Sequence, residues 1–288
     1  MHGGQKQKLE CALYVVATPI GNLRDISLRA LDVLGCTDVI AAEDTRNSAH
    51  LLTHHGIAAS RLLALHQHNE RGAAEKVIAL LAQGRSVALV SDAGTPAVSD
   101  PGALLIANVR AAGYRVIPVP GANAAVAALS ASGLPAPHFL FYGFLPNKSA
   151  ARRSALQDLV ALPYTLVFYE APHRIIECVA DLHSVFGDER QIVFAREITK
   201  LFESIHRCTL AEAMGWLHAD ANNQRGEFVL LVSGAVAQEE GLSAEAEHVL
   251  TTLLRELSLK QAVQLAVQIT GAGKNELYQR ALEIKEQE

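Results

Sequence analysis

Acidic, basic and turn-forming residues cluster directly after several apolar runs of this sequence. The clusters are Thr18-Pro19-Ile20-Gly21-Asn22, Glu43-Asp44-Thr45-Arg46, Ser91 to Pro96, and Pro120-Gly121-Ala122-Asn123-Ala124. Glycine permits positive φ and close backbone approach, whereas proline fixes φ, so such turns are pre-shaped to hold a ligand against bare backbone. For any single cluster, an ordinary strand-to-helix turn is the alternative.

Side chains that could exchange a proton lie beside the same ends of apolar runs. They are Glu43, Asp44, Asp92, Glu170, His173, Glu197 and Lys200. A positioned base contributes roughly 10² to 10⁴ in rate. Lys200 could act as a base if desolvation lowered its pKa, or it could hold a phosphate. We select Lys200, Glu197 and Asp92 as catalytic candidates, with a structural ion pair as the alternative for Lys200 and Glu197.

The elements that would position these residues alternate between strand and helix from residue 13 to about residue 129. Predicted strands are 13–17, 39–42, 87–90 and 116–119, and predicted helices include 28–34, 72–83 and 104–112. This alternation indicates a doubly wound α/β domain, residues 11–134, with a parallel sheet. Because parallel strands end at one edge, the four clusters are expected to converge there, where open α/β sheets bind ligands.

The remaining chain divides into two further parts. Residues 138–236 carry predicted strands at 165–169, 191–195 and 227–232 and a helix at 174–186, a mixed α+β pattern. Residues 242–288 are rich in helix formers, with a break at Gly271-Ala272-Gly273. Helices joined by such a turn resemble a helix-turn-helix unit, and a helical tail packed on the body is the alternative. Residues 1–10 are polar and expected to be disordered.

Composition excludes several classes of protein. The chain has 288 residues and a net charge of −5, which argues against non-specific coating of nucleic acid. Its apolar runs are too short to span a bilayer, so we expect a soluble cytoplasmic protein with no membrane partner. The four cysteines form no CxxC pair. His54-His55 and His66-x-His68 complete no metal spacing, so no metal is expected.

The glycine-containing turns also limit the ligand. There is no G-x-G-x-x-G after the first strand and no G-x-x-x-x-G-K-[ST], so no phosphate cradle is indicated. A small ligand without phosphates fits better. S-adenosylmethionine qualifies, because its adenosine can lie on Gly and Ala backbone and its cationic groups suit carboxylates; other nucleosides remain open.

A series of motifs resembles the ribosomal RNA small subunit methyltransferase I family. The motifs are Thr18 to Leu23, Glu43 to Arg46, Ser91 to Pro96 with Ser99 to Gly102, Gly143 to Pro146, Tyr169 to Arg174, and Arg196 to Lys200. The match runs in unbroken order from about residue 13 to residue 232. The resemblance implies a two-domain, tetrapyrrole-methylase-like (class III) fold with a small helical extension. It also implies a homodimer and S-adenosylmethionine-dependent 2′-O-methylation of a decoding-centre cytidine in the 16S rRNA of the small ribosomal subunit.

The resemblance also implies which residues hold the cofactor between the two domains. They are Pro19, Gly94, Thr95, Pro96, Val98, Asn123 and Ala124, with Tyr169, Glu227 and Phe228 from the second domain. Tetrapyrrole methylases commonly carry Asp in a Gly-Asp-Pro run where this chain has Thr95, so no carboxylate contact is implied at that position.

Basic residues follow the aromatic run 139–144. Lys148, Arg152 and Arg153 could contact phosphates while the aromatics stack on bases, although a buried strand followed by a solvated helix start is the alternative. Arg46, Arg174 and Arg196 could extend this predicted RNA-binding cleft.

Two other functions stay open from the sequence. The same fold could methylate a tetrapyrrole precursor, or the protein could be a non-enzymatic module that binds a nucleoside or RNA.

Overall fold

The computed structural model describes residues 9–58, 62–65, 69–135, 137–235, 242 and 244–286. The chain divides into two compact units, Met1–Gly234 and Ala235–Glu288. Most of the N-terminal segment predicted to be disordered, and His66 and His68, lie outside the described residues.

The first sheet of the larger unit is fully parallel. Its five strands run in the order β3 (Leu62–Ala64), β2 (Val39–Ala42), β4 (Val87–Val90), β1 (Leu13–Val16) and β5 (Val116–Val119). The four predicted strands are confirmed; β3 was not predicted.

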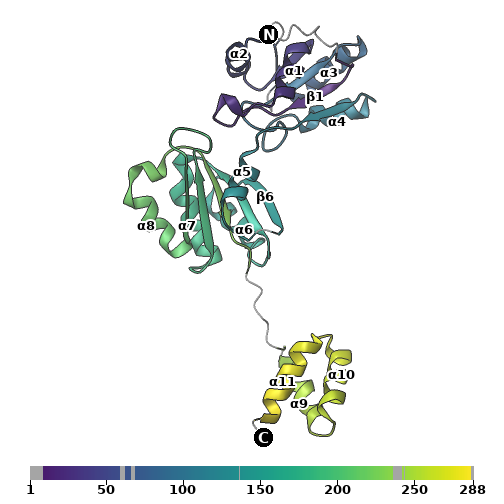
Figure 1. Ribbon diagram of the computed structural model, residues 1–288, viewed down its shortest axis with the longest axis vertical. Helices are drawn as coiled ribbons and strands as arrows, with labels where there is room; N and C mark the ends of the chain where they lie inside the picture. The colour runs from purple at the N-terminus through teal and green to yellow at the C-terminus, as the bar shows by residue number, and fades with distance from the viewer. Residues whose placement is uncertain are drawn as a thin grey trace. The chain divides into compact units, whose positions relative to one another are not determined.

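Helices cover both faces of this sheet (Figure 1). They are α1 (Leu28–Cys36), α2 (Thr45–His54), α3 (Glu70–Ala82) and α4 (Ala103–Ala111). Successive strand residues point to opposite faces: Tyr14 and Ala88 pack with α1 and α2, whereas Leu13 and Leu89 pack with α3 and α4. The doubly wound α/β prediction is confirmed.

The second sheet is mixed. Its order is β6 (Phe139–Phe144), β7 (Thr165–Glu170), β10 (Phe228–Val232), β8 (Gln191–Arg196) and β9 (Ser204–Thr209). Only the β6–β7 pair is parallel among these strands. The three predicted strands are confirmed, and the aromatic run 139–144 is itself edge strand β6.

Helices on the two faces of the second sheet come from different parts of the chain. The helices α6 (Ser149–Gln157), α7 (Ile175–Phe186) and α8 (Leu210–Ala219) pack on one face. On the other face lies α5 (Ala124–Ala131), whose Ala125 and Ala128 pack against Val167 and Val229. Short 3₁₀ turns span Leu23–Asp25, Pro172–Arg174 and Ala221–Gln224. The turn that follows β5 therefore leads directly into a helix that supports the second sheet.

The smaller unit contains the helices α9 (Ala244–Leu254), α10 (Leu259–Thr270) and α11 (Lys274–Glu286). They share a small apolar core that includes Leu250, Val263 and Leu277. Gly271, at φ 71°, ends α10 in the left-handed conformation that glycine adopts easily, as its position in the sequence predicts. Among the described residues, no helix is long and apolar enough to cross a membrane.

Candidate active site

The loops at the carboxyl edge of the first sheet are bonded to one another. Thr18 and Gly94 exchange two backbone hydrogen bonds of 2.8 and 3.1 Å. The Thr95 hydroxyl donates to the carbonyl of Ala122 at 3.2 Å. The backbone N–H of Asp44 donates to Asp92 Oδ1 at 3.0 Å. The expected convergence of the four loops therefore occurs, and it fixes the shape of this edge.

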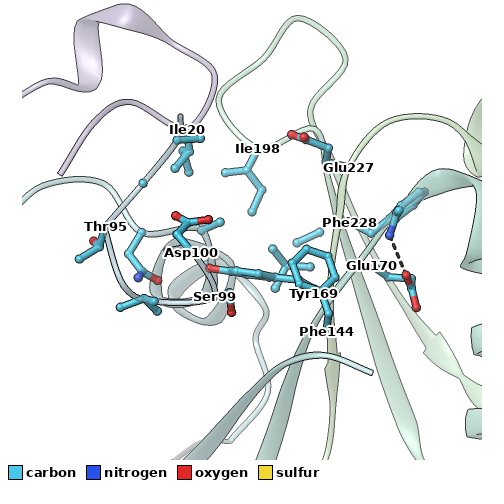
Figure 2. Close-up of a pocket in the computed structure, with 18 of the residues that line it drawn as sticks. Ile20, Thr95, Ser99, Asp100, Phe144, Tyr169, Glu170, Ile198, Glu227 and Phe228 are labelled. Carbon is cyan, nitrogen blue, oxygen red and sulfur yellow. Dashed lines mark hydrogen bonds between the residues drawn. The ribbon is translucent and has the colours of Figure 1, made fainter. Parts of the chain in front are cut away.

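A cavity of about 320 Å³ lies beside this edge, between residues of the two sheets (Figure 2). Of the residues predicted to hold a cofactor, eight line it: Gly94, Thr95, Val98, Asn123, Ala124, Tyr169, Glu227 and Phe228. Pro19 lines an adjoining cavity instead, and the buried Pro96 is part of neither lining. The lining also includes Ile20, Ser99, Asp100, Phe144 and Ile198, which sequence reasoning did not select as site residues.

The loop after β4 holds an uncommon backbone shape. Gly94, Ala97, Ser99 and Gly102 have φ values of 77°, 66°, 65° and 131°. A positive φ at a non-glycine residue costs on the order of 1–3 kcal/mol and persists only where its surroundings enforce it. One anchor is Glu70 Oε1, which accepts the N–H groups of Gly102 and Leu104, both at 2.9 Å. This backbone conformation places Ser99 and Asp100 in the wall of the cavity.

Asp100 is the most perturbed carboxyl group of the cavity. Burial, with repulsion from Glu43 and Asp92, raises its pKa to about 6, although a hydrogen bond with Ser91 acts in the opposite direction. Its side chain and that of Tyr169 extend from opposite walls toward the same space (Figure 2). The Tyr169 hydroxyl accepts the N–H of Ala125 at 3.3 Å. Asp100 thus adds negative charge to a largely apolar site.

Lys200 lines the cavity and belongs to an ion-pair network. Its Nζ donates to Glu197 Oε1 at 2.9 Å and to Glu227 Oε2 at 2.7 Å. Burial alone would lower the pKa of Lys200, but the hydrogen bonds and charges of the two carboxylates outweigh it and raise the pKa. The idea that desolvation makes Lys200 a base is therefore wrong.

Glu197 belongs to the same network and not to the cavity lining. Burial acts to raise its pKa, yet the hydrogen bonds from Lys200 and from the backbone of Glu227 lower it overall. Gly21 packs closely against this loop, since a Cβ there would lie 2.6 Å from Lys200 Cγ. The ion-pair alternative describes both predicted catalytic residues: the pair ties the loop after β8 to Glu227 just before β10, and Gly21 of the β1 loop packs against it.

Asp92 serves as a junction between loops. Its Oδ1 accepts the backbone N–H of Asp44, and its Oδ2 accepts the side-chain amide of Asn47 at 3.1 Å.

The remaining proton-carrier candidates have other partners. Glu170 is buried, accepts the N–H of Ala171 at 2.8 Å, and its carboxylate lies 3.2 Å from Arg174 Nε. Glu43 has a raised pKa, owing chiefly to burial. The other proposed proton carriers do not line the cavity: Asp44 caps α2 and pairs with Arg46, while His173 is exposed.

The basic residues predicted to bind RNA fall into two groups. Arg46, Lys148 and Arg153 are exposed. Arg152, by contrast, is fully buried and donates from Nε to Asp181 Oδ2 at 2.7 Å, so its selection as a phosphate contact is wrong. The structural role of Arg152 depends on Asp181 of α7, and the residues around Arg152 in the sequence do not identify this partner.

The other two arginines are largely engaged within the protein. Arg174 donates to the carbonyl of Leu145 at 2.8 Å and pairs with Glu170. Arg196 donates to the hydroxyl of Ser204 at 3.0 Å. Their contacts position the ends of β6 and β8 beside the cavity.

Comparison with known proteins gives two family matches. The family model described as tetrapyrrole (corrin/porphyrin) methylases matches residues 12–214, and the RsmI C-terminal HTH domain matches residues 240–285. The helix-turn-helix prediction for the tail is thereby confirmed. Together with the paired sheets and the cavity at their junction, these matches define a methyltransferase of the tetrapyrrole methylase class.

Similar proteins over nearly the whole chain narrow this class. A ribosomal RNA small subunit methyltransferase I from Pseudomonas aeruginosa is 55% identical over 273 residues, covering 94% of this chain and 96% of the relative. Its counterpart from Escherichia coli O157:H7 is 52% identical, covering 94% of each chain. The chain therefore belongs to the ribosomal RNA small subunit methyltransferase I family.

Solved structures support the fold. A cobalt precorrin-4 methyltransferase aligns with a TM-score of 0.57 at 14% identity, covering 78% of this chain and 95% of the other. Diphthine synthase aligns with a TM-score of 0.59 at 16% identity, covering 77% and 89%. At such identities the likeness concerns architecture alone.

Proposed function

We propose that this protein transfers a methyl group from S-adenosylmethionine to the ribose 2′-hydroxyl of a decoding-centre cytidine in 16S rRNA. The observation that carries the proposal is the 55% identity, over almost the entire chain, to a protein named for methylation of small-subunit ribosomal RNA. The nucleotide and the ribose position rest on the motif resemblance. The same proposal holds that the protein is a homodimer that works in the cytoplasm on the small ribosomal subunit.

The chemistry of the cavity fits this cofactor. S-adenosylmethionine carries a cationic sulfur and an ammonium group beside an apolar adenosine. The lining offers Ile20, Val98 and Phe228 as apolar surface, and Asp100 and Glu227 as carboxylates. Lys200, which also lines the cavity, is paired with the carboxylates of Glu197 and Glu227. Its positive charge is therefore neutralised, and the net charge of the cavity stays negative. Asn123 and Ala124, at the start of α5, add polar backbone.

When bound, the cofactor would supply a methyl group on positively charged sulfur: the ribose oxygen would gain the O–CH3 bond as the S–CH3 bond breaks, the hydroxyl proton would pass to solvent water, and the neutral thioether product would be left to dissociate. Lys200 keeps its proton, so it acts as a donor: two N–H groups hold Glu197 and Glu227, and the third can orient a ribose or phosphate oxygen. The rigid loops contribute by alignment, which can supply effective molarities of about 10⁵ M or more. Positioning, more than a strong base, accounts for catalysis in this proposal.

The test is methyl transfer from radiolabelled S-adenosylmethionine to small ribosomal subunits that lack the mark. Label at the cytidine ribose 2′ position is expected. Label in a porphyrinogen instead would favour the tetrapyrrole alternative. If calorimetry detects binding of neither the cofactor nor its demethylated product, the non-enzymatic alternative is favoured.

A further inference from the structure

A second cavity of about 280 Å³ adjoins the first. The two share Ile20, Ala93, Lys200 and Glu227 in their linings. Groups bound in the two cavities would therefore meet at this shared wall. The second cavity is otherwise built from the loop after β1, the first turns of α2 and the loop after β4.

The α2 helix gives this second cavity a mixed surface. Positions three and four apart lie on one helix face, which places Asn47, His50 and Leu51 together in the lining. Leu51 and Leu23 are half-buried and supply apolar surface to the lining. Asn47 and His50 are exposed polar groups with hydrogen-bonding capacity. An apolar surface beside a polar edge suits a heteroaromatic ring.

Asp92 adds a fixed acceptor to that polar edge. Its two oxygens are held by the Asp44 N–H at 3.0 Å and the Asn47 amide at 3.1 Å. Ionised carboxylate oxygens accept more than one hydrogen bond each, so Asp92 can still receive a donor from a ligand. The Asn47 amide nitrogen donates to Asp92, and none of the hydrogen bonds among the described residues engages its carbonyl oxygen, which can serve as a second acceptor.

We propose that this second cavity is the acceptor subsite, where the target nucleoside of an RNA strand inserts its base against Leu23 and Leu51 with its amino edge toward Asp92 and Asn47. The inference rests on the proposed function and names the part of the site that selects the nucleoside. Cytosine presents an amino donor where uracil presents a carbonyl oxygen, and carboxylates pair with that amino group. Asp92 therefore selects against uridine by repulsion as well as for cytidine by attraction.

The surroundings of the subsite suit an extruded nucleotide. With the base inserted, the ribose lies at the shared wall, within reach of the free N–H of Lys200. The Arg46 guanidinium is 89% exposed at the start of α2 and can meet a flanking phosphate. Enzymes that modify one nucleotide commonly draw it out of its stack into such a pocket.

The first experiment separates the two cavities. Methylation kinetics on unmodified small subunits and calorimetric binding of S-adenosylmethionine are measured for wild type, Asn47→Ala, His50→Ala, and a control, His54→Ala, which lies on α2 outside both linings. We expect kcat/KM to fall tenfold or more for Asn47→Ala and His50→Ala, with cofactor Kd unchanged within twofold and the control like wild type. Equal loss of cofactor binding, or kcat/KM within twofold of wild type in both variants, overturns the proposal.

The second experiment tests base selection with Asp92→Asn. Subunits are reconstituted with cytidine or uridine at the methylated position. Wild type is expected to favour cytidine at least tenfold, and Asp92→Asn to reduce the preference to about threefold, because an amide both donates and accepts. An unchanged preference in Asp92→Asn, or none in wild type, contradicts the subsite. Failure of wild type to methylate any subunit would instead refute the proposed function.

Discussion

Replacing Asp100 by Asn is expected to stabilise the protein while weakening cofactor binding. The pKa of Asp100 is raised from 3.8 to about 6 in the folded protein, chiefly by burial. Each pKa unit corresponds to about 1.4 kcal/mol, so the charged group costs at most about 3 kcal/mol of folding free energy. Asp100 is partly exposed, and solvent screening reduces this to about 1.5 kcal/mol.

A carboxyl group whose pKa is higher in the folded state contributes its stability below the unfolded pKa and loses it as pH rises through about 6. The gain from Asp100→Asn should therefore be about 1.5 kcal/mol at pH 7.5, about half of that at pH 5, about a fifth of it at pH 4, and close to zero near pH 3. The gain disappears because wild-type Asp100 is then itself neutral.

Urea unfolding without ligand at these pH values measures the gain, with Asp158→Asn at the exposed end of α6 as the control. Calorimetry should show S-adenosylmethionine binding to Asp100→Asn with a Kd about fivefold to tenfold higher, since a carboxylate facing a cationic ligand is lost. A variant less stable than wild type at pH 7.5, or a gain that does not shrink at lower pH, would show that the charge of Asp100 does not destabilise the folded protein.

Three further changes test other parts of the account. Arg152→Met should lower the free energy of unfolding by about 3 kcal/mol, because the buried Asp181 loses its 2.7 Å ion pair and keeps only the Ser149 hydroxyl and the exposed Arg153 at 3.9 Å; Arg153→Met, which removes only the longer contact, should change it by about 0.5 kcal/mol or less in the same urea titration, and equal effects would contradict the distinction. Gly21→Ala should reduce kcat/KM tenfold or more with little change in Tm, because the new methyl group meets Lys200 and displaces its loop; normal kinetics would show that this loop has no positioning role. Removing residues 235–288 should leave the Kd for S-adenosylmethionine within twofold, because the cavity lies entirely in the first compact unit; loss of binding by the folded, truncated protein would place part of the site elsewhere.

The sequence predicted those parts of the fold that local pattern controls. The buried runs that form β1 and β4 are apolar throughout, and Gly271 ends α10 as a C-terminal glycine should. The strand β3 was not predicted from the sequence because it has only three residues, which are half-buried or exposed. The turn before Ala124 was recognised, but the helix that follows is a run of small residues with no amphipathic pattern, and its packing against the second sheet is non-local.

The candidate site shows the same division between features that local sequence determines and features that depend on distant contacts. Turn motifs located the loops of the first sheet that form one wall of the cavity, because glycine and proline mark a required backbone shape, whereas the individual cofactor-binding residues came from the family resemblance. Charge states were not predictable, since they depend on distant partners: Lys200 pairs with a carboxylate 27 residues away, and Arg152 with one 29 residues away. Asp100 stood within a recognised motif, yet its role emerged only from its burial and from its neighbours Glu43 and Asp92.

The most direct test of the proposed function is to map the methyl group that the purified protein adds to unmodified small subunits. The 16S rRNA is digested after the reaction with labelled S-adenosylmethionine, and the nucleosides are separated by mass spectrometry. We expect 2′-O-methylcytidine at one decoding-centre position, with label absent when subunits already carry the mark. Label on a base or on protein, or none at all from a preparation that binds the cofactor, would contradict it.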